Sequence, residues 1–418
     1  MKSPFTKGLL TGAAIGGMAK RWWTSRARSG ALGSLRMGLT DGEEQVGLAL
    51  AQATSASLVG GNRVAWRHDG AIFDALEEAF RAAEHSIHVG VYIWKPGGVG
   101  TRLAELACRR AREGVAVRIL VDPMGSTGFE EELTEPLLAA GCQVRYFRPP
   151  KRRPFALTGR NHRKVVVVDG KVGFTGGFGI AQEWSTGKDG APWRDANAEV
   201  EGPVVRHMQA SFAAHWLETG GALLPRAELE RARPAGDARA AYVTSTDVVG
   251  LSHARWVTHI ALMAARRRAW IANAYFVPPP EVFGALLLLP RHGVDLRLLL
   301  PGPHLDHPIV RFLQRRYYGR LRRGGANVWE YQASMMHAKT MLVDDRLVVV
   351  GSINLDFLSM QWLEEGCLVV DDAGFAAALE ARWHDDLARA RQVVAGAPPA
   401  SAPARRRREA ALESAHAG

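Results

Sequence analysis

The segment His162-Arg163-Lys164-Val165-Val166-Val167-Val168-Asp169 recurs later in the chain as His337-Ala338-Lys339-Thr340-Met341-Leu342-Val343-Asp344. Both copies read H-x-K-x4-D, and each is followed at the same distance by a turn of small residues, Gly176-Gly177-Phe178-Gly179 and Gly351-Ser352-Ile353-Asn354. Residues i and i+2 of an extended strand share a face, so each histidine projects beside its lysine. Two copies indicate an internal duplication, and a duplicated His/Lys pair predicts one site built by two halves.

The two pairs supply the side chains that phosphodiester cleavage without a metal requires. One imidazole can act as nucleophile and the other as proton donor, because histidine is neutral or protonated near neutral pH. The lysines provide compact positive charge for the phosphate oxygens. Asn354, Ser352 and Thr340 can add hydrogen bonds to those oxygens. The alternative is that H-x-K is the polar end of a buried strand; the matched turns after both copies favour a site.

On these motifs the chain resembles the phospholipase D superfamily, and more narrowly the bacterial cardiolipin synthases. The resemblance covers about residues 60 to 390. The paired motif is specific for the superfamily, and short motifs elsewhere in the chain favour the synthases over nuclease relatives. These flanking motifs are Tyr92-Ile93-Trp94, Val117–Asp122, Trp193-Arg194-Asp195, Glu201-Gly202-Pro203, Tyr275–Pro278, Leu298–Gly302, Tyr317-Tyr318, Glu330–Gln332 and Gly351–Asp356.

The resemblance implies a two-step transfer of a phosphatidyl group. His162 would attack the phosphorus of phosphatidylglycerol and carry the covalent phosphatidyl group. His337 would protonate the departing glycerol and then deprotonate the incoming alcohol. Lys164, Lys339 and Asn354 would bind the phosphoryl oxygens. No metal or cofactor is implied, since no cluster of carboxylates or histidines has ligand spacing.

The resemblance also implies that an acid from the opposite half orients each imidazole, Glu365 for His162 and Asp195 for His337. Ser352 belongs with these residues as a phosphate-binding or orienting side chain. Asp169 and Asp344 complete the catalytic motif as structural members. They lie one strand length beyond the histidines and are expected to brace the turn that follows.

The chain departs from the family pattern at three positions. Gly179 stands where the second half has Asn354, so the first half lacks that amide. Leu358 occupies a place where these synthases usually carry arginine, and Asn197 stands where histidine is expected. None removes a catalytic residue, so they put the substrate preference in doubt rather than the activity.

Several functions remain open on the sequence. Phosphatidylglycerol or phosphatidylethanolamine can be the donor, and water as acceptor would make the protein a phospholipase D. A nuclease is the second enzyme that the motif allows. The presence of both motif copies in one chain and the flanking motifs argue against nucleic acid as the partner. An inactive membrane-surface scaffold is a third, and two intact His/Lys pairs argue against it.

The composition fits a globular protein with anionic partners. At 418 residues the chain can form two domains with substantial cores. The net charge of +11 suggests a membrane surface or nucleic acid, although basic charge can also serve solubility. Cys108, Cys142 and Cys367 lack metal-ligand spacing and are expected to be reduced.

The ends of the chain are basic. Residues 1–45 form a leader whose apolar stretch, Gly8 to Ala19, is shorter than the roughly 20 residues that a membrane span needs. With Trp22-Trp23 it is either a surface anchor or a disordered leader. Residues 393–418 are expected to be a disordered basic tail. Many synthases of the family begin with transmembrane helices, but no spanning segment is expected in this sequence, so we expect a peripheral protein on the cytoplasmic face of the bacterial inner membrane.

Between the ends, strands alternate with helices, which predicts an α/β fold. We expect two pseudo-symmetric phospholipase D-type domains, 60–220 and 241–392, each a mixed sheet flanked by helices, with 221–240 as linker and the active site at the interface. Helices are expected at 75–84, 253–267 and 308–323, among others, and strands at 86–92 and 327–331.

Three further segments have two interpretations each. The basic loop Pro149 to Pro154 is either a solvated turn or a headgroup contact, and we favour the latter. The run Leu286 to Leu289 is expected to be core, with interfacial insertion as the minority view. The arginines between 311 and 323 form either a solvated face or a surface for anionic lipid.

Overall fold

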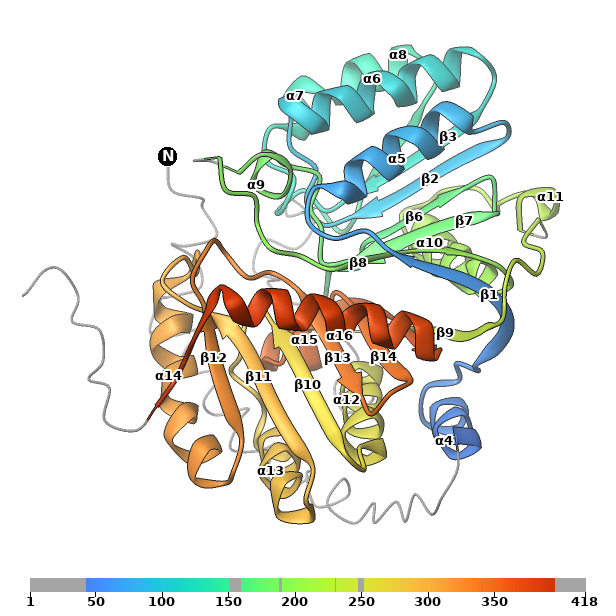
Figure 1. The fold of residues 1–418 in the computed structure, drawn as a ribbon. Helices are drawn as coiled ribbons and strands as arrows, with labels where there is room; N and C mark the ends of the chain where they lie inside the picture. The colour runs from blue at the N-terminus through green and yellow to red at the C-terminus, as the bar shows by residue number, and fades with distance from the viewer. Residues whose placement is uncertain (1–42, 150–158, 188–189, 230, 247–251, 395–418) are drawn as a thin grey trace, which may run out of the picture.

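A computed structural model describes residues 43–149, 159–187, 190–229, 231–246 and 252–394. The elements of the first half are packed above those of the second (Figure 1). A helix, α4 (Glu43–Thr54), precedes the duplication. The first half consists of β1 (Val59–Trp66), α5 (Ala71–Ala82), β2 (Ser86–Val91), α6 (Gly98–Arg112), β3 (Ala116–Val121), α7 (Phe129–Glu132), α8 (Thr134–Ala139), β4 (Gln143–Tyr146), β5 (Arg160–Asn161), β6 (Val165–Val168), β7 (Val172–Gly176), α9 (Gln182–Ser185), β8 (Asn197–Glu201) and α10 (Val205–Glu218).

The second half repeats the order of the main strands. It consists of α11 (Arg226–Leu229), β9 (Ala238–Ser245), α12 (His253–Ala264), β10 (Arg268–Asn273), α13 (Pro280–Leu288), the 3-10 turn η2 (Pro290–His292), β11 (Asp295–Pro301), α14 (Pro308–Arg323), β12 (Asn327–Tyr331), β13 (Lys339–Val343), β14 (Leu347–Gly351), α15 (Phe357–Gln361), β15 (Leu363–Asp371), α16 (Ala373–Ala388) and β16 (Ala390–Gln392).

The sheets of the two halves join into one. The strand order is β16-β12-β11-β10-β13-β14-β15-β9-β1-β8-β7-β6-β2-β3-β4. It reads the same from both ends when β1 is matched with β9, β6 with β13 and β8 with β15, apart from the added β16. The symmetry centre is the antiparallel pair β1–β9. The predicted α/β fold of two pseudo-symmetric halves is confirmed, and the mixed sheets of the two halves form one continuous sheet.

Both motif strands are buried on both faces. In β6, Val165 and Val167 pack into a central core shared by the two halves, whereas Val166 and Val168 pack under α5 and α6. This alternation explains the unbroken valine run, because a strand covered on both faces needs apolar side chains on each. Each His/Lys pair therefore lies at the N-terminal end of a rigid, fully packed strand.

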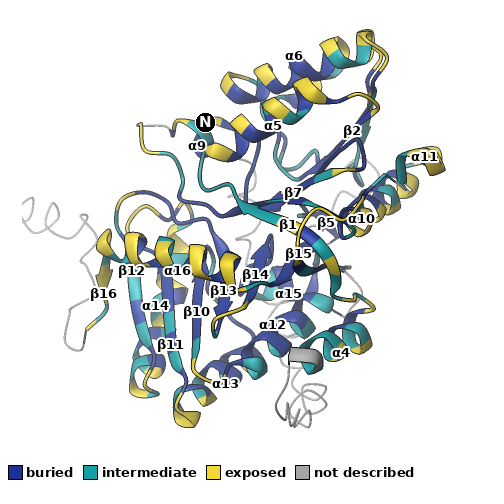
Figure 2. Cartoon of the chain, turned by 45° about the vertical axis from the view of Figure 1, so that its right-hand side comes forward, coloured by how far each residue is buried: buried dark blue, intermediate teal, exposed yellow. Residues whose placement is uncertain are grey.

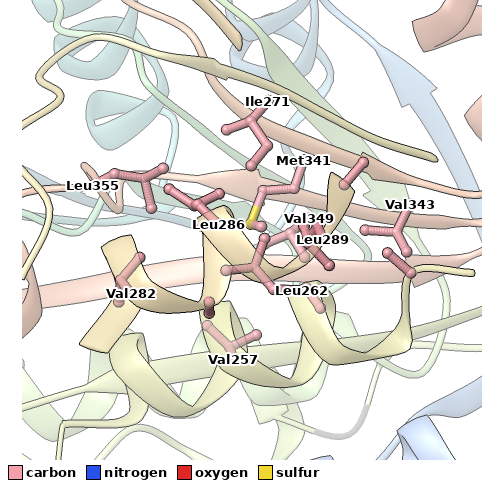
Figure 3. Close-up of a cluster of buried hydrophobic side chains, with 14 of the residues drawn as sticks. Val257, Leu262, Ile271, Val282, Leu286, Leu289, Met341, Val343, Val349 and Leu355 are labelled. Atoms are coloured by element: carbon pink, nitrogen blue, oxygen red, sulfur yellow. The ribbon is translucent and has the colours of Figure 1, made fainter. Parts of the chain in front are cut away.

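The outer face of the second half is covered by α12 and α13. Leu286 and Leu289 point into this core beside Val282 and Met341 (Figure 3). Leu288, by contrast, is exposed. The predicted core position of the leucine run is confirmed for the two residues that face the sheet. The three cysteines are buried and free.

Several boundaries differ from the expected domain limits. α4 lies just after the leader in sequence but packs against α12 of the second half, with Leu50 in its core. The segment expected as linker contains α11 and the start of β9. Buried residues fill most strands, apart from β1, β4 and β16, and exposed ones lie mainly on the outer faces of the helices (Figure 2). Most of the leader, the tail and the loop residues 150–154 lie outside the described residues.

No helix in the described part of the chain has the length and apolar character that crossing a bilayer requires.

Candidate active site

His162 lies between the short strand β5 and β6, at the junction of the two halves. Its Nδ1 is 2.9 Å from Oε1 and 3.0 Å from Oε2 of Glu365, which lies on β15. The His162 amide donates to the carbonyl of Glu364 at 2.8 Å. Both the ring and the backbone of this histidine are therefore held by the other half of the chain.

His337 is held in the same way by the first half. Its Nδ1 lies 2.8 Å from Oδ2 of Asp195, and its amide donates to the carbonyl of Arg194 at 2.7 Å. A carboxylate at Nδ1 favours the tautomer with the proton on that nitrogen, which leaves Nε2 free as an acceptor or nucleophile. The structure thus brings together both crossed His–acid pairs that were expected from the sequence.

Each acid also accepts a hydrogen bond from a second side chain, and these side chains differ between the halves; Asp195 accepts in addition from the amide of Ala196 at 2.8 Å. The Ser352 hydroxyl donates to Glu365. At the matching position, Gly177 leaves the space that Asp195 fills, because a Cβ there would lie 2.2 Å from Oδ1 of Asp195. Asp195 instead accepts from Nε1 of Trp184 at 2.7 Å. Ser352 therefore acts as an orienting contact of the acid in the structure.

The lysines are buried beside the histidines. Nζ of Lys164 donates to the carbonyl of His162 at 2.7 Å, and Nζ of Lys339 lies 2.9 Å from the ring nitrogens of His337. Neither ammonium forms an ion pair with a carboxylate of the described residues. Two buried cations without paired anions are costly, and this arrangement is typical of a site that receives an anion.

Burial and mutual repulsion lower the basicity of all four groups. Desolvation lowers the pKa of Lys164 to about 7 and that of Lys339 to about 8. Desolvation, together with the Lys339 charge, lowers the pKa of His337 to about 3, and the pKa of His162 is lowered mainly by burial. Burial alone would raise the pKa of Asp195, but His337 and Lys339 hold it below its usual range.

These shifts predict how anion binding depends on pH. A phosphodiester stays a monoanion between pH 5 and 9, so changes in its affinity in this range come from the protein. We expect the dissociation constant of a non-reactive diester analogue to rise steadily above pH 7 to 8, because the two lysines lose their charge there, by up to tenfold per pH unit for each proton that binding takes up.

The check is titration calorimetry of the analogue from pH 6 to 9, with Lys164→Met and Lys339→Met as controls. Each variant should bind more weakly and show a shallower slope. An affinity that stays constant to pH 9 in the unmodified protein would show that the lysines do not carry the phosphate charge.

Asn354 lies in the turn after β14 and is buried. Its Oδ1 has no hydrogen-bond partner among the described residues, so the side-chain amide retains unused capacity. In the first half, the equivalent Gly179 has no room for a side chain, because a Cβ would lie 2.9 Å from the Trp184 ring. The missing amide is thus replaced by the indole that holds Asp195.

Asp169 and Asp344 lie at the far ends of β6 and β13 and do not join the histidines. Asp169 accepts from the amides of Glu84, His85 and Ser86 at 2.9, 2.7 and 2.9 Å. Asp344 accepts in the same way from the amides at 266–268. Both have positive φ, +55° and +49°. Their contacts are to backbone, which corrects their grouping with the catalytic residues.

These contacts also explain where two helices end. Helices were predicted at 75–84 and 253–267, but α5 ends at Ala82 and α12 at Ala264. The motif aspartate takes the amides that follow each helix, and the chain turns directly into the next strand. The aspartate thus ties the end of each motif strand to the start of its neighbour.

We expect Asp169→Ala and Asp344→Ala each to lower the free energy of unfolding by about 2–3 kcal/mol, because three amides lose a charged acceptor. Turnover per folded molecule should fall less than tenfold. Urea denaturation and activity measured on the same samples test this, with Asp169→Asn as the conservative control. A loss of activity comparable to that of a histidine variant, at unchanged stability, would contradict the bracing role.

Comparison with known proteins identifies the family of the chain. Residues 76–216 and 259–387 match the family described as "Cardiolipin synthase, PLD-like domain". Cardiolipin synthase A of Pseudomonas fluorescens is 34% identical over 327 residues, 78% of this chain and 68% of that protein. Cardiolipin synthase 1 of Bacillus anthracis is 32% identical over 306 residues, 69% of this chain and 59% of that protein.

The chain belongs to the cardiolipin synthase family. It is a phosphatidyltransferase of the phospholipase D superfamily. Among solved structures, phosphatidylserine synthase of Haemophilus influenzae shares the fold with a TM-score of 0.64 at 14% identity, covering 84% of this chain and 92% of that one. Polyphosphate kinase of Porphyromonas gingivalis has a TM-score of 0.55 at 11% identity, covering 85% and 53%.

Two of the departures from the family pattern have structural explanations. Gly179 makes room for Trp184, as described above. Oδ1 of Asn197 accepts from the amides of Gly177 and Phe178, both at 3.1 Å, so this side chain shapes the turn beside Asp195. Nothing in the structure explains Leu358.

Sequence reasoning missed several residues around this family site. Arg163, inside the first motif, is buried and pairs with Glu364 at 2.8 Å, fixing the strand that carries Glu365. Trp184 places its ring 5.0 Å from that of His337, beside Trp193 of the expected Trp193-Arg194-Asp195 motif at 5.3 Å. The signal for Arg163 was its charge at a position where the second copy has alanine. Trp184 had no such signal.

No group of three or more His, Cys, Asp or Glu side chains in the described ranges is arranged to hold a metal ion.

Proposed function

We propose that this member of the cardiolipin synthase family transfers the phosphatidyl group of phosphatidylglycerol to an alcohol through a phosphohistidine intermediate. The observation that carries the proposal is the pair of crossed His–acid contacts beside two buried, unpaired lysines. Each half supplies an imidazole and the acid for the other imidazole. Such a site needs both halves, which suits a reaction that requires one imidazole as nucleophile and a second for proton transfer.

In the first step, Nε2 of His162 attacks the phosphorus and the bond from phosphorus to the headgroup oxygen breaks. Glu365 at Nδ1 offsets the positive charge that the ring acquires. His337 gives its Nε2 proton to the departing glycerol oxygen. Its pKa of about 3 belongs to the site without phosphate. The negative charge of the bound diester favours the protonated form that this step needs.

In the second step, His337 takes the proton of the acceptor hydroxyl. The alcohol oxygen attacks the phosphorus, the bond from phosphorus to His162 breaks, and His162 returns to its neutral form. Lys164, Lys339 and Asn354 bind the non-bridging oxygens in both steps. The assignment of His162 as nucleophile rests on the family resemblance.

The test is incubation of purified protein with labelled phosphatidylglycerol in mixed micelles containing a chelator, followed by separation of the lipids. Cardiolipin with free glycerol is the expected result. Phosphatidic acid alone would identify water as the acceptor and contradict the transferase proposal for this lipid. Absence of both, with cleavage of a labelled DNA duplex by the same sample, would favour a nuclease.

We further propose that the protein works at the cytoplasmic face of the inner membrane as a peripheral protein. The acid-free basic segment at the start of the sequence supports this. Deleting residues 1–36 should weaken binding to anionic vesicles more than it lowers turnover in detergent micelles. Vesicle sedimentation measures the first quantity, and unchanged binding would remove this segment from the proposal.

A further inference from the structure

Helix α14 carries a stripe along one face that is exposed throughout. The stripe consists of six positions, Ile309, Phe312, Leu313, Arg316, Arg320 and Arg323, and all are exposed. Their spacing of three and four residues places them within about 100° around the helix axis. The opposite face is buried through Gln314, Tyr318 and Leu321. The helix therefore packs by one side and presents the other to its surroundings.

The stripe is apolar at the N-terminal end of α14. Ile309, Phe312 and Leu313 are 46%, 63% and 36% exposed. Large apolar side chains that gather on one exposed helix face mark a contact surface more strongly than isolated ones do. None of them packs into the core that α14 covers.

The stripe is basic toward the C-terminal end of α14. Arg316, Arg320 and Arg323 form no ion pair with any carboxylate in the described part of the chain. Arg311 and Arg315, on the flank of the same helix, instead point toward Glu330, at 4.0 and 3.2 Å. The positive charge of the helix is thus neutralised beside the sheet and left uncompensated on the stripe.

The apolar end follows a loop that reaches toward the active site. α14 comes after β11, whose last residues lie at the same end of the sheet as the pair Lys339–Asn273, and it packs against β12 (Figure 1). In the loop before the helix, Asp306 accepts from the Tyr275 hydroxyl at 2.9 Å, and the Tyr275 ring lies 6.3 Å from that of His337. Bound lipid at Ile309 and Phe312 would therefore lie near the reacting groups.

The first half differs from the second at the place that corresponds to α14. Between β3 and β4 it carries the short helices α7 and α8, whose first turns hold Glu130, Glu131, Glu132 and Glu135. Acidic residues there would repel an anionic surface. Because the fold forms without a long basic helix at this place in one half, the stripe on α14 is not a requirement of the fold.

We propose that the α14 stripe is an interfacial anchor that docks the second half on an anionic phospholipid bilayer. The apolar side chains enter the boundary between headgroups and acyl chains, and the arginines contact lipid phosphates. The choice of lipid as partner rests on the proposed function, but the docking itself does not depend on turnover. A bilayer in this position would deliver phospholipid to the mouth of the site from one side.

The test uses the full chain and vesicles of phosphatidylglycerol and phosphatidylcholine. Phe312→Ser/Leu313→Ser and Arg316→Glu/Arg323→Glu should each weaken sedimentation with anionic vesicles at least tenfold. The matched controls are Leu223→Ser, an exposed leucine between α10 and α11, and Arg109→Glu/Arg112→Glu on α6, which should change binding less than twofold. Turnover of phosphatidylglycerol in detergent micelles should stay within twofold of the unmodified protein for all four.

The outcomes separate docking from catalysis. A selective loss of vesicle binding supports the anchor even if no variant, nor the unmodified protein, makes cardiolipin. Equal losses in the stripe and control variants would overturn it. It would also be overturned if the stripe variants lost binding to DNA but not to vesicles, or if light scattering showed that Phe312→Ser/Leu313→Ser converts a dimer to a monomer.

Discussion

His162→Ala is expected to lower turnover of phosphatidylglycerol by at least about 10⁵-fold, since the variant lacks the atom that forms the covalent intermediate. His337→Ala should lose at least about 10³-fold, because leaving alkoxide and incoming alcohol then lack their proton donor and acceptor. Both should unfold within a few degrees of the unmodified protein, since each imidazole packs at the surface of the site rather than in a core. His259→Ala, a half-buried histidine on α12, is the matched control and should keep full activity.

A phosphatidyl ester of p-nitrophenol separates the two roles. Its leaving group departs without a proton, so His337→Ala should release one equivalent of nitrophenolate in a burst and retain the phosphatidyl group on His162. Mass spectrometry of the quenched variant locates the adduct. A burst in His162→Ala, with an adduct on His337, would reverse the assignment. A burst in both variants would contradict a single nucleophile.

Asp195→Asn is expected to lower kcat by about 10³–10⁴-fold, because an amide can present the wrong hydrogen-bonding group to His337 and cannot stabilise its protonated form. The Michaelis constant should change little, since Asp195 contacts the imidazole rather than the phosphate. The structure allows a sharp control. Trp184→Phe removes one donor to the same carboxylate, so it should cause a smaller loss of kcat, about tenfold.

The pH profile distinguishes orientation from structural damage. With Asp195 uncharged, the pKa of His337 should fall further, because a raising influence is lost while the Lys339 charge remains. The limb of the kcat–pH profile that reflects the ionisation of His337 should therefore move to lower pH. A profile of unchanged shape with the same fall in kcat would indicate that Asp195 only supports packing.

The sequence by itself predicted most of the elements of this protein and the residue types of its candidate site. The duplicated H-x-K-x4-D motif identified both histidines and both lysines, and the alternation of strands and helices predicted the α/β halves. Helix α14 and strand β12 were located at their observed limits. These features depend on the local periodicity of apolar residues and on residue type, and both can be read from the amino-acid sequence.

The tertiary structure decided how the halves complete one another. The resemblance suggested the crossed acids, but only folding places Glu365 at His162 and brings Arg194 to the backbone of His337. Arg163 and Trp184 depend on neighbours more than 10 positions away, and Gly179 is explained only by the indole that occupies its space. The limits of α5 and α12 also depended on distant contacts, since Asp169 and Asp344 capture the amides beyond each helix.

In the stripe on α14, some features follow from the sequence and others from tertiary packing. Its arginines and apolar residues are visible in the sequence, and the helix is predicted correctly. Which arginines are neutralised is decided by Glu330 from another strand, and which face is exposed is decided by the sheet beneath. Sequence fixes the period of a helix, whereas packing decides which face of it remains for a partner.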